Sequence, residues 1–339
     1  MKASTLVEPR RREFLARTSA LGAVGLLGWP QHTIAADPPP EKARVRIVHA
    51  PFVCLAPQYL AAEFFPIEGI TDWEYVQMGS RSGGIDAIAE GRADFTMWDA
   101  HSPIPLIDTG KPIVVLAGVH GGCYQLFCNE SVRSIRDLKG KTPVVHYLGG
   151  GDHVLLSSML AQVGVDPKEV NWITGSGGDA KDQFASGKAD AFMGFAQEPA
   201  ELRARNVGRV ILNTAQDRPW SQYYCCVVLA NRDFVARHPI VTKRVLRSIL
   251  KASDICASDP ERVARFLVDM RYETRYPIGL EVLKNTTYTR WRFDNPEDTL
   301  RFHALRLREG GLIKSTPQQL IARGTDWRFL NELKQELKS

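Results

Sequence analysis

The sequence predicts an α/β fold of two lobes, joined by a hinge of two crossing strands and followed by a helical C-terminal tail packed on lobe one. Three observations predict this class. A strand-and-helix unit occurs twice in the chain, a long apolar run follows each copy, and beyond residue 231 the apolar spacing becomes helical.

The repeat is the clearest of the three. Residues 85–94 (IDAIAEGRAD) are matched 96 positions later by residues 181–190 (KDQFASGKAD), and Val48-His49 has a counterpart in Val145-His146. Similar spacing over roughly fifty residues is not expected of two unrelated segments. We therefore interpret the repeat as a duplicated folding unit.

Each copy has the pattern strand, helix, strand, helix, strand. Short loops between helices and apolar strands predict parallel βαβ units with right-handed crossovers. Gly91 and Gly187 follow the second helix of each copy, where a left-handed cap is expected. The predicted elements are residues 45–48, 57–65, 73–77, 85–90 and 93–97 in the first copy, and 142–146, 154–163, 170–173, 179–186 and 189–193 in the second.

The hinge is predicted from apolar, strand-like runs at residues 113–127 and 222–229, each placed where the chain would leave one lobe for the other. After Asn231 no third α/β lobe is predicted, so the tail should pack on lobe one. Three of its helices start at a proline, which suits a first helical turn. The predicted tail helices are residues 234–254, 260–270, 280–285, 296–309 and 317–323.

The N-terminus predicts export. Residues 10–15 (RRREFL) contain a twin-arginine pair, an apolar stretch occupies residues 20–29, and Ala35 and Ala36 follow. Spanning a bilayer needs about 20 apolar residues, so a membrane anchor is not favoured. We expect the twin-arginine export machinery to carry the chain to the periplasm, with cleavage near Ala35 or Ala36. The predicted division is signal peptide 1–36, linker 37–43, lobe one 44–130 and 231–339, and lobe two 131–230.

Composition indicates a globular protein with no nucleic-acid partner. The 339 residues are 44% apolar, and the net charge of +5 falls to +2 when residues 1–36, with five basic and two acidic side chains, are set aside. No run of 18 apolar residues follows residue 36, so no membrane span is predicted there.

Several short motifs carry a resemblance to a known family over about residues 44–330. The chain resembles the type II periplasmic binding proteins, and within them the SsuA-like branch that binds nitrate, sulfonates, taurine and thiamine-pyrimidine precursors. The resemblance implies a two-lobed fold that closes on a small molecule. The motifs are residues 89–95 (AEGRADF), 110–113 (GKPI), 137–141 (DLKGK), 231–234 (NRDF), 238–239 (HP) and 310–313 (GGLI).

Candidate ligand-binding residues lie in loops beyond the carboxyl ends of the strands, where open α/β sheets bind ligands near helix N-termini. After the first strands, three glycines of the second copy would let the backbone approach a ligand, and the loop matches the ligand loop of the family. A flexible turn in which Asp152 caps the helix is the alternative interpretation. These loops select Phe52 and Cys54 in lobe one, and Gly150, Gly151, Asp152 and His153 in lobe two.

Other candidates follow the remaining strands. Arg81 and Ser82 enter a helix and suit an anion, although a solvated Arg is the alternative. Trp98 would stack on a flat ligand, Glu198 would accept a hydrogen bond from an amine, and Asp99 would bind ligand or cap a helix. The last candidates are Tyr124 and Tyr224 on the crossing strands, where aromatic residues also form core.

Two ligand classes stay open at this point. Arg81 and the helix N-termini favour an organic anion such as a sulfonate or carboxylate, and we take this as the first choice. Trp98, Glu198 and Tyr224 instead favour a flat, amine-bearing ring such as a pyrimidine.

No metal or cofactor is predicted. The eight histidines include no HxxxH or HExxH pair, and His49, His101, His146 and His153 would converge only through the fold. Buried free thiols are the default for the six cysteines. An oxidising compartment also allows a disulfide between Cys123 or Cys128 and Cys225 or Cys226, if the crossing strands are neighbours.

The expected function is a periplasmic solute-binding component of an ABC importer, with a small-molecule ligand and an inner-membrane permease as partners. It needs no catalytic residue, because ligand contacts to both lobes shift the population toward closure. One alternative is an enzyme like the thiamine-pyrimidine synthases of this fold, whose Cys-rich segment resembles residues 224–226 (YCC), although export argues against it. The other is a periplasmic sensor that presents its ligand to a membrane receptor.

Overall fold

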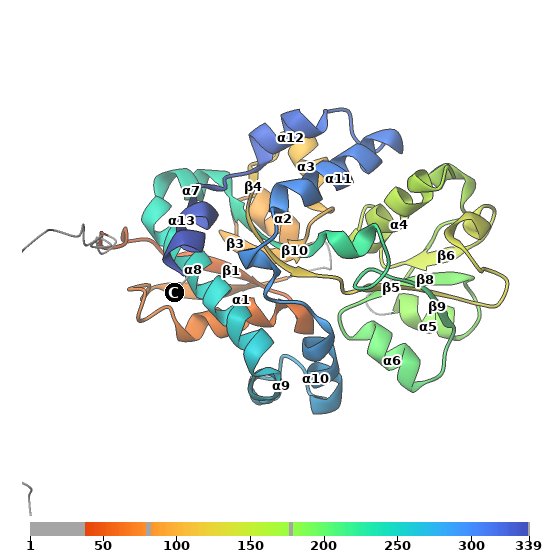
Figure 1. Cartoon of the computed structure of the whole chain (residues 1–339), viewed down its shortest axis with the longest axis horizontal. Coiled ribbons are helices and arrows are strands. Elements are labelled where there is room, and N and C mark those ends of the chain that lie inside the picture. Colours follow the sequence, from red (N-terminus) through yellow and green to blue (C-terminus); the bar gives the residue numbers. More distant parts are fainter. Residues whose placement is uncertain (1–37, 79–82, 176–178, 338–339) are drawn as a thin grey trace, which may run out of the picture. The chain divides into compact units, whose positions relative to one another are not determined.

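Two five-stranded mixed sheets organise the chain (Figure 1). The computed structural model describes residues 38–78, 83–175 and 179–337. The predicted signal peptide lies outside the described residues, as do Arg81 and Ser82. Both sheets and the helices around them confirm the predicted α/β class with two lobes.

The first sheet has the strand order β2-β1-β3-β10-β4. Strand β1 pairs in parallel with β2 and β3, whereas β10 pairs antiparallel with β3 and β4. Every residue of β3, β4 and β10 is buried. The strands are β1 (Val45–His49), β2 (Trp73–Gln77), β3 (Phe95–Asp99), β4 (Ile113–Gly121) and β10 (Tyr224–Asn231).

The second sheet repeats this plan in the order β7-β6-β8-β5-β9. Strand β6 pairs in parallel with β7 and β8, and β5 pairs antiparallel with β8 and β9. In both sheets three parallel strands of one repeat copy are thus followed by an antiparallel pair. The strands are β5 (Tyr124–Cys128), β6 (Pro143–Val145), β7 (Ile173–Thr174), β8 (Ala191–Phe195) and β9 (Arg209–Asn213).

The first crossing between sheets runs directly from β4 to β5. The sequence predicted one continuous strand over 113–127, but the chain breaks at Gly122, which has a φ of +42°. A Cβ there would lie 2.3 Å from the Ala215 Cα, so only glycine fits this close passage of the two crossing segments.

The second crossing differs from the prediction. Strand β10 belongs wholly to the first sheet, and the chain reaches it from β9 through residues 214–223, which include a short 3-10 turn at Trp220–Gln222. Strand β9 was not predicted. Sheet membership therefore differs from the predicted lobe limits at both crossings, because β5 joins the second sheet and β10 the first.

The repeated aspartates fix equivalent strands in the two copies. Asp94 Oδ2 accepts a hydrogen bond from the Arg46 backbone N–H at 2.8 Å, and Asp190 Oδ2 accepts one from Thr142 N–H at 2.9 Å. Because each aspartate also donates its own N–H to the carbonyl of the same partner, it joins the first and third strands of its copy. The repeated motif therefore serves the scaffold.

Element boundaries are less well predicted than element types. The third strands, β3 and β8, begin two residues later than predicted, after these aspartates. Strand β7 is Ile173–Thr174 and shares only Ile173 with the segment predicted as 170–173. The helices of the repeats are α1 (Ala56–Leu60), α2 (Gly83–Ala89), α3 (Pro103–Asp108), α4 (Gly151–Gln162), α5 (Asp179–Ala185) and α6 (Glu198–Ala204).

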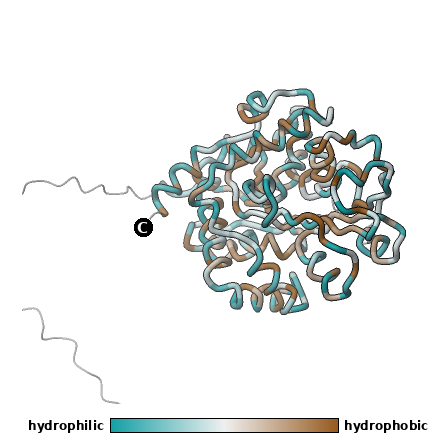
Figure 2. Tube along the Cα trace, turned by 45° about the vertical axis from the view of Figure 1, so that its right-hand side comes forward, coloured by the Kyte–Doolittle hydropathy of each residue, from teal (hydrophilic) through white to brown (hydrophobic). Residues whose placement is uncertain are grey.

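The tail is helical, as predicted, and most of it packs on the first sheet and its helices. Helix α8 contacts α1 and β4, and α12 contacts α3 and β4, but α10 also reaches α6 and α11 reaches α4. Hydrophobic and hydrophilic residues are interspersed along the whole Cα trace (Figure 2). The tail helices are α7 (Arg232–Arg237), α8 (Pro239–Ser258), α9 (Pro260–Asp269), α10 (Tyr276–Asn285), α11 (Pro296–Glu309), α12 (Pro317–Gly324) and α13 (Arg328–Glu336).

Within the described residues, no helix combines the length and apolar character needed to cross a bilayer.

Candidate functional site

An aromatic cavity lies between the loops that follow the strands of the two sheets. Its empty space, including the open mouth, amounts to about 490 Å³. Five aromatic rings and two carboxylates belong to its wall. The lining residues are Phe52, Cys54, Leu55, Trp98, Asp99, Cys123, Tyr124, His146, Tyr147, Gly151, Asp152, Phe195 and Cys226.

Aromatic rings from both sheets meet in this wall. Phe52, which follows β1, packs edge-on against Phe195 at the end of β8, with ring centroids 5.1 Å apart. Trp98 contacts Phe52 from one side, and Tyr124 contacts Phe195 from the other. A flat ligand between these rings would be held by stacking and edge-to-face contacts.

A buried ion network stands in the second-sheet half of the cavity. His146 Nδ1 lies 2.8 Å from Asp152 Oδ2, and His146 Nε2 lies 2.8 Å from Glu198 Oε1. Burial alone would lower the pKa of His146, but Glu198 and Asp152 outweigh it and raise the pKa to about 9. At neutral pH the imidazole is therefore charged, between two carboxylates.

This network decides against the alternative interpretation, in which Asp152 caps the helix. Helix α4 begins at Gly151 with Gly150 as its N-cap, and no side chain caps it. The Asp152 carboxylate instead accepts hydrogen bonds from the backbone N–H and the ring of His146. Glu198 also accepts a hydrogen bond from Phe195 N–H at 3.2 Å, so it fixes the end of β8.

Asp99 is the carboxylate of the first-sheet half. Its Oδ1 accepts a hydrogen bond from Ser102 N–H at 2.8 Å, so it caps the turn before α3, as one of the two interpretations predicted. The same oxygen lies 3.1 Å from His101 Nε2, and that nitrogen also lies 2.7 Å from the Gly151 carbonyl oxygen. His101 thereby links the two halves of the site.

Gly151 lies at a close approach between the halves. A Cβ at this position would lie 2.6 Å from Asp99 Oδ2 and 2.7 Å from the Tyr124 hydroxyl. Any larger side chain would separate the two carboxylate-bearing loops. The sequence predicted glycine here because the backbone would approach a ligand closely. In the structure the backbone instead approaches side chains across the site, those of Asp99 and Tyr124.

The structure brings most of the sequence candidates together. Arg81 and Ser82 lie outside the described residues. Glu198 is not itself in the lining, but it bonds two lining residues, the His146 ring and the Phe195 backbone N–H. The candidates that line the cavity are Phe52, Cys54, Trp98, Asp99, Tyr124, Gly151 and Asp152.

Three further candidates are not in the lining. Gly150 is the N-cap of α4, and His153 packs its ring on Trp172 at 4.7 Å. Tyr224 donates its hydroxyl to the Arg290 carbonyl at 2.8 Å. A bulge between Tyr224 and Cys226 breaks the alternation of β10, so Cys226 lines the cavity and Tyr224 does not.

Several lining residues were not selected from the sequence. His146 was visible as the repeat partner of His49, and Phe195 as the end of the third strand, but neither was chosen as a ligand contact. The pairing of His146 with Glu198, 52 residues away, is visible only in the fold. The other unselected lining residues are Leu55, Cys123, Tyr147 and Cys226.

All six cysteines are free thiols. Cys123 and Cys225, from the two crossings, have their Sγ atoms 2.6 Å apart. A disulfide between the two crossings therefore stays a prediction. Cys123 and Cys225 are the pair whose sulfur atoms are in contact.

A family model described as "NMT1/THI5 like" matches residues 55–263, which is more than half of the chain. The chain belongs to the NMT1/THI5-like family. This family assignment agrees with the SsuA-like resemblance of the sequence motifs. No curated protein matches this NMT1/THI5-like chain.

Solved structures similar to this NMT1/THI5-like protein have the periplasmic-binding-protein fold. The nitrate-binding protein NrtA from Synechocystis PCC 6803 is 17% identical with a TM-score of 0.71, over 89% of this chain and 90% of that one. A putative sulfonate-binding SsuA from Methylobacillus flagellatus KT is 21% identical with a TM-score of 0.65, over 87% and 95%. The alkanesulfonate-binding SsuA from Xanthomonas axonopodis pv. citri is 19% identical with a TM-score of 0.67, over 86% and 100%.

Proposed function

We propose that this NMT1/THI5-like chain is an exported solute-binding component of an ABC importer, and that it closes two lobes on a flat ring bearing amino groups. The fold and the family support a binding role. The observation that carries the ligand class is the cavity wall, in which two carboxylates stand among five aromatic rings.

The wall supports the amine-bearing ring over the organic anion. Asp99 and Asp152 are hydrogen-bond acceptors, which an amino or protonated ring nitrogen would satisfy and a sulfonate would not. Among the described residues that line the cavity, none is Lys or Arg, and the charged His146 is already paired with Asp152 and Glu198. The preference for an anion rested on the helix N-termini and on Arg81, which lies outside the described residues.

Contacts between the two halves of the site support lobe closure, and a bound ligand would add to them. His101 to the Gly151 carbonyl and Gln197 to the Pro51 carbonyl already join the halves at 2.7 Å and 3.3 Å. Two ion pairs, Arg203–Glu281 and Arg275–Glu201, also join α6 to α10 and to its N-cap residue. A ring held between Asp99 and Asp152 would add affinity only in this closed arrangement, so it would shift the population toward closure. The inner-membrane permease is then the partner of the closed form.

A thermal-shift panel of aminopyrimidines, alkanesulfonates and carboxylates tests the ligand class. An aminopyrimidine at a hundred times its Kd should stabilise the purified protein by about 2.7 kcal/mol, and sulfonates should have no effect. Asp99→Asn should weaken aminopyrimidine binding by about 10-fold or more, because it removes a charged acceptor. Tyr224→Phe is the matched control and should leave affinity unchanged, since this hydroxyl faces Arg290.

Stabilisation by sulfonates alone would contradict the proposal. Recovery of the bound ring, followed by mass spectrometry, separates binding from catalysis. An unchanged ring supports a binding protein, and a converted ring supports the synthase-like alternative.

A further inference from the structure

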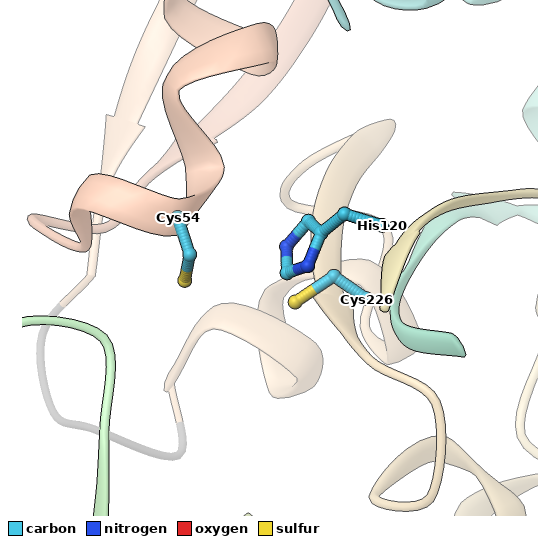
Figure 3. Close-up of side chains that lie close together, drawn as sticks. All are labelled: Cys54, His120 and Cys226. Atoms are coloured by element: carbon cyan, nitrogen blue, oxygen red, sulfur yellow. The ribbon is translucent and has the colours of Figure 1, made fainter. Parts of the chain in front are cut away.

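Two cysteines and a histidine from three separate elements converge behind the cavity. Cys54 lies in the short 3-10 turn Val53–Leu55 after β1, His120 lies on β4, and Cys226 lies opposite His120 on β10. All three are buried, and their donor atoms lie within 4.8 Å of one another. Figure 3 shows the three side chains turned toward a common centre.

The histidine carries an unsatisfied nitrogen. His120 is fully buried, and its Nε2 has no hydrogen-bond partner in the described part of the chain. A buried polar atom without a partner is destabilising and calls for an explanation. The groups facing the ring include the Cys54 and Cys226 sulfurs, which are weak hydrogen-bond partners but strong metal ligands.

From this arrangement we infer that Cys54, His120 and Cys226 form a binding site for a thiolate-seeking divalent cation of the zinc type. Two thiolates and one imidazole are a soft ligand set that suits Zn²⁺. Two thiolates neutralise the double charge, which matters in a buried setting. With Zn–S bonds of about 2.3 Å, tetrahedral ligand sulfurs lie about 3.8 Å apart, so the donors need to move by about 1 Å or less.

The site has an opening on one side. Cys54 and Cys226 both line the aromatic cavity, so a cation held by them and His120 would face it. Three protein ligands leave a fourth tetrahedral position, which water takes in sites of this kind. Cation binding does not depend on the solute proposed above, and the solute panel run with a chelator keeps the two tests apart.

A neighbouring trio shares one of these ligands. Cys123, Cys225 and Cys226 also lie within 4.8 Å of one another, but the Cys123 and Cys225 sulfurs already contact each other. The set with His120 is preferred because it explains the unsatisfied nitrogen and needs neither Cys123 nor Cys225.

Cobalt titration of the reduced, chelator-treated protein tests the site directly. We expect one equivalent of Co²⁺ to produce thiolate-to-cobalt charge-transfer absorption, and Zn²⁺ to displace it. The absence of that absorption in the unaltered protein would overturn the proposal, and this measurement needs no variant.

Variants assign the ligands. Cys54→Ser, His120→Gln and Cys226→Ser should each weaken Co²⁺ binding by more than about 100-fold, beyond the effect of losing a supporting contact. Cys128→Ser, a buried thiol on β5, is the matched control and should bind like the unaltered protein. The double variant Cys123→Ser/Cys225→Ser should also bind, and its failure would transfer the site to the other trio and refute this one. Circular dichroism of each metal-free variant checks that it is folded.

Discussion

His49 in the first repeat copy and His146 in the second both follow a valine at the end of equivalent strands, yet their surroundings are opposite. His49 is half-buried among the rings of Tyr59, Tyr75 and Tyr272, and burial lowers its pKa. His146 lies between two carboxylates that raise its pKa to about 9. Duplication has kept the scaffold and changed the chemistry.

The scaffold positions show how close the two copies remain. Asp94 and Asp190 bond the same strand position in each copy, and Gly91 and Gly187 have φ values of +69° and +78°. The copies differ where side chains face the cavity. There the first copy contributes Phe52, Trp98 and Asp99, and the second contributes Phe195 and the charged network of His146. Two similar halves thereby make a cavity with aromatic rings on both sides and the charged His146 network on the second side.

Replacing each histidine in turn should give the largest difference in stability between the two repeat copies. His146→Gln leaves Asp152 and Glu198 buried without their cation, and should lower the free energy of unfolding by about 3–5 kcal/mol. His49→Gln loses ring contacts and should cost about 1 kcal/mol. Denaturant unfolding of both variants measures the difference. Equal losses would mean that the network contributes nothing beyond packing.

The pH dependence of stability should separate the two histidines next. Because the folded pKa of His146 lies above the ordinary value, its contribution is complete below about pH 6.5 and is lost as the pH rises through about 9. The loss is on the order of 3 kcal/mol over this window. For His49 the sign is reversed, because burial lowers its folded pKa. Its contribution to stability is present at pH values above the ordinary histidine pKa and is lost as the pH falls through the folded pKa.

The measurement is the difference in unfolding free energy between the unaltered protein and His146→Gln, taken at several pH values. This difference should shrink toward alkaline pH, and the corresponding difference for His49→Gln should change only on the acidic side. A difference that stays constant up to about pH 9.5 would contradict the charged state of His146.

The fold was largely predictable because its signals are local. Glycine caps, repeated aspartates and apolar strands each lie within one copy, so periodicity and repetition reveal them. The crossings were predicted less well, since the break at Gly122 depends on Ala215, which is close only in the fold. Strand β9 was missed for a related reason: it is an edge strand with exposed residues and lacks a continuous apolar run.

The site was predictable in position but not in detail. Loops after strand ends selected Phe52, Asp99 and Asp152, which all line the cavity, because topology alone brings these ends together. The bulge that turns Tyr224 away could not be inferred from strand alternation. Cys54, His120 and Cys226 lie on three elements with no spacing pattern, so sequence predicted no metal site where the structure supports one.

The smallest expected effect is the loss of stability when the capping glycine of either copy is replaced. It tests whether the two copies share the same backbone scaffold. Gly91→Ala and Gly187→Ala should each destabilise the protein by about 1 kcal/mol, because alanine is strained at a left-handed φ. No heavy atom lies within 4 Å of a Cβ built at Gly187, and the nearest one at Gly91 is Asn231 Nδ2 at 3.7 Å, so neither substitution adds a clash. Gly279→Ala, inside α10 with an open neighbourhood, is the control and should stabilise slightly. Because the backbone conformations are nearly the same, the two losses should agree within about 0.5 kcal/mol, and denaturant unfolding resolves that difference. A loss confined to one copy would show that the equivalence ends at the hydrogen bonds of the aspartates and does not extend to the turns that precede them.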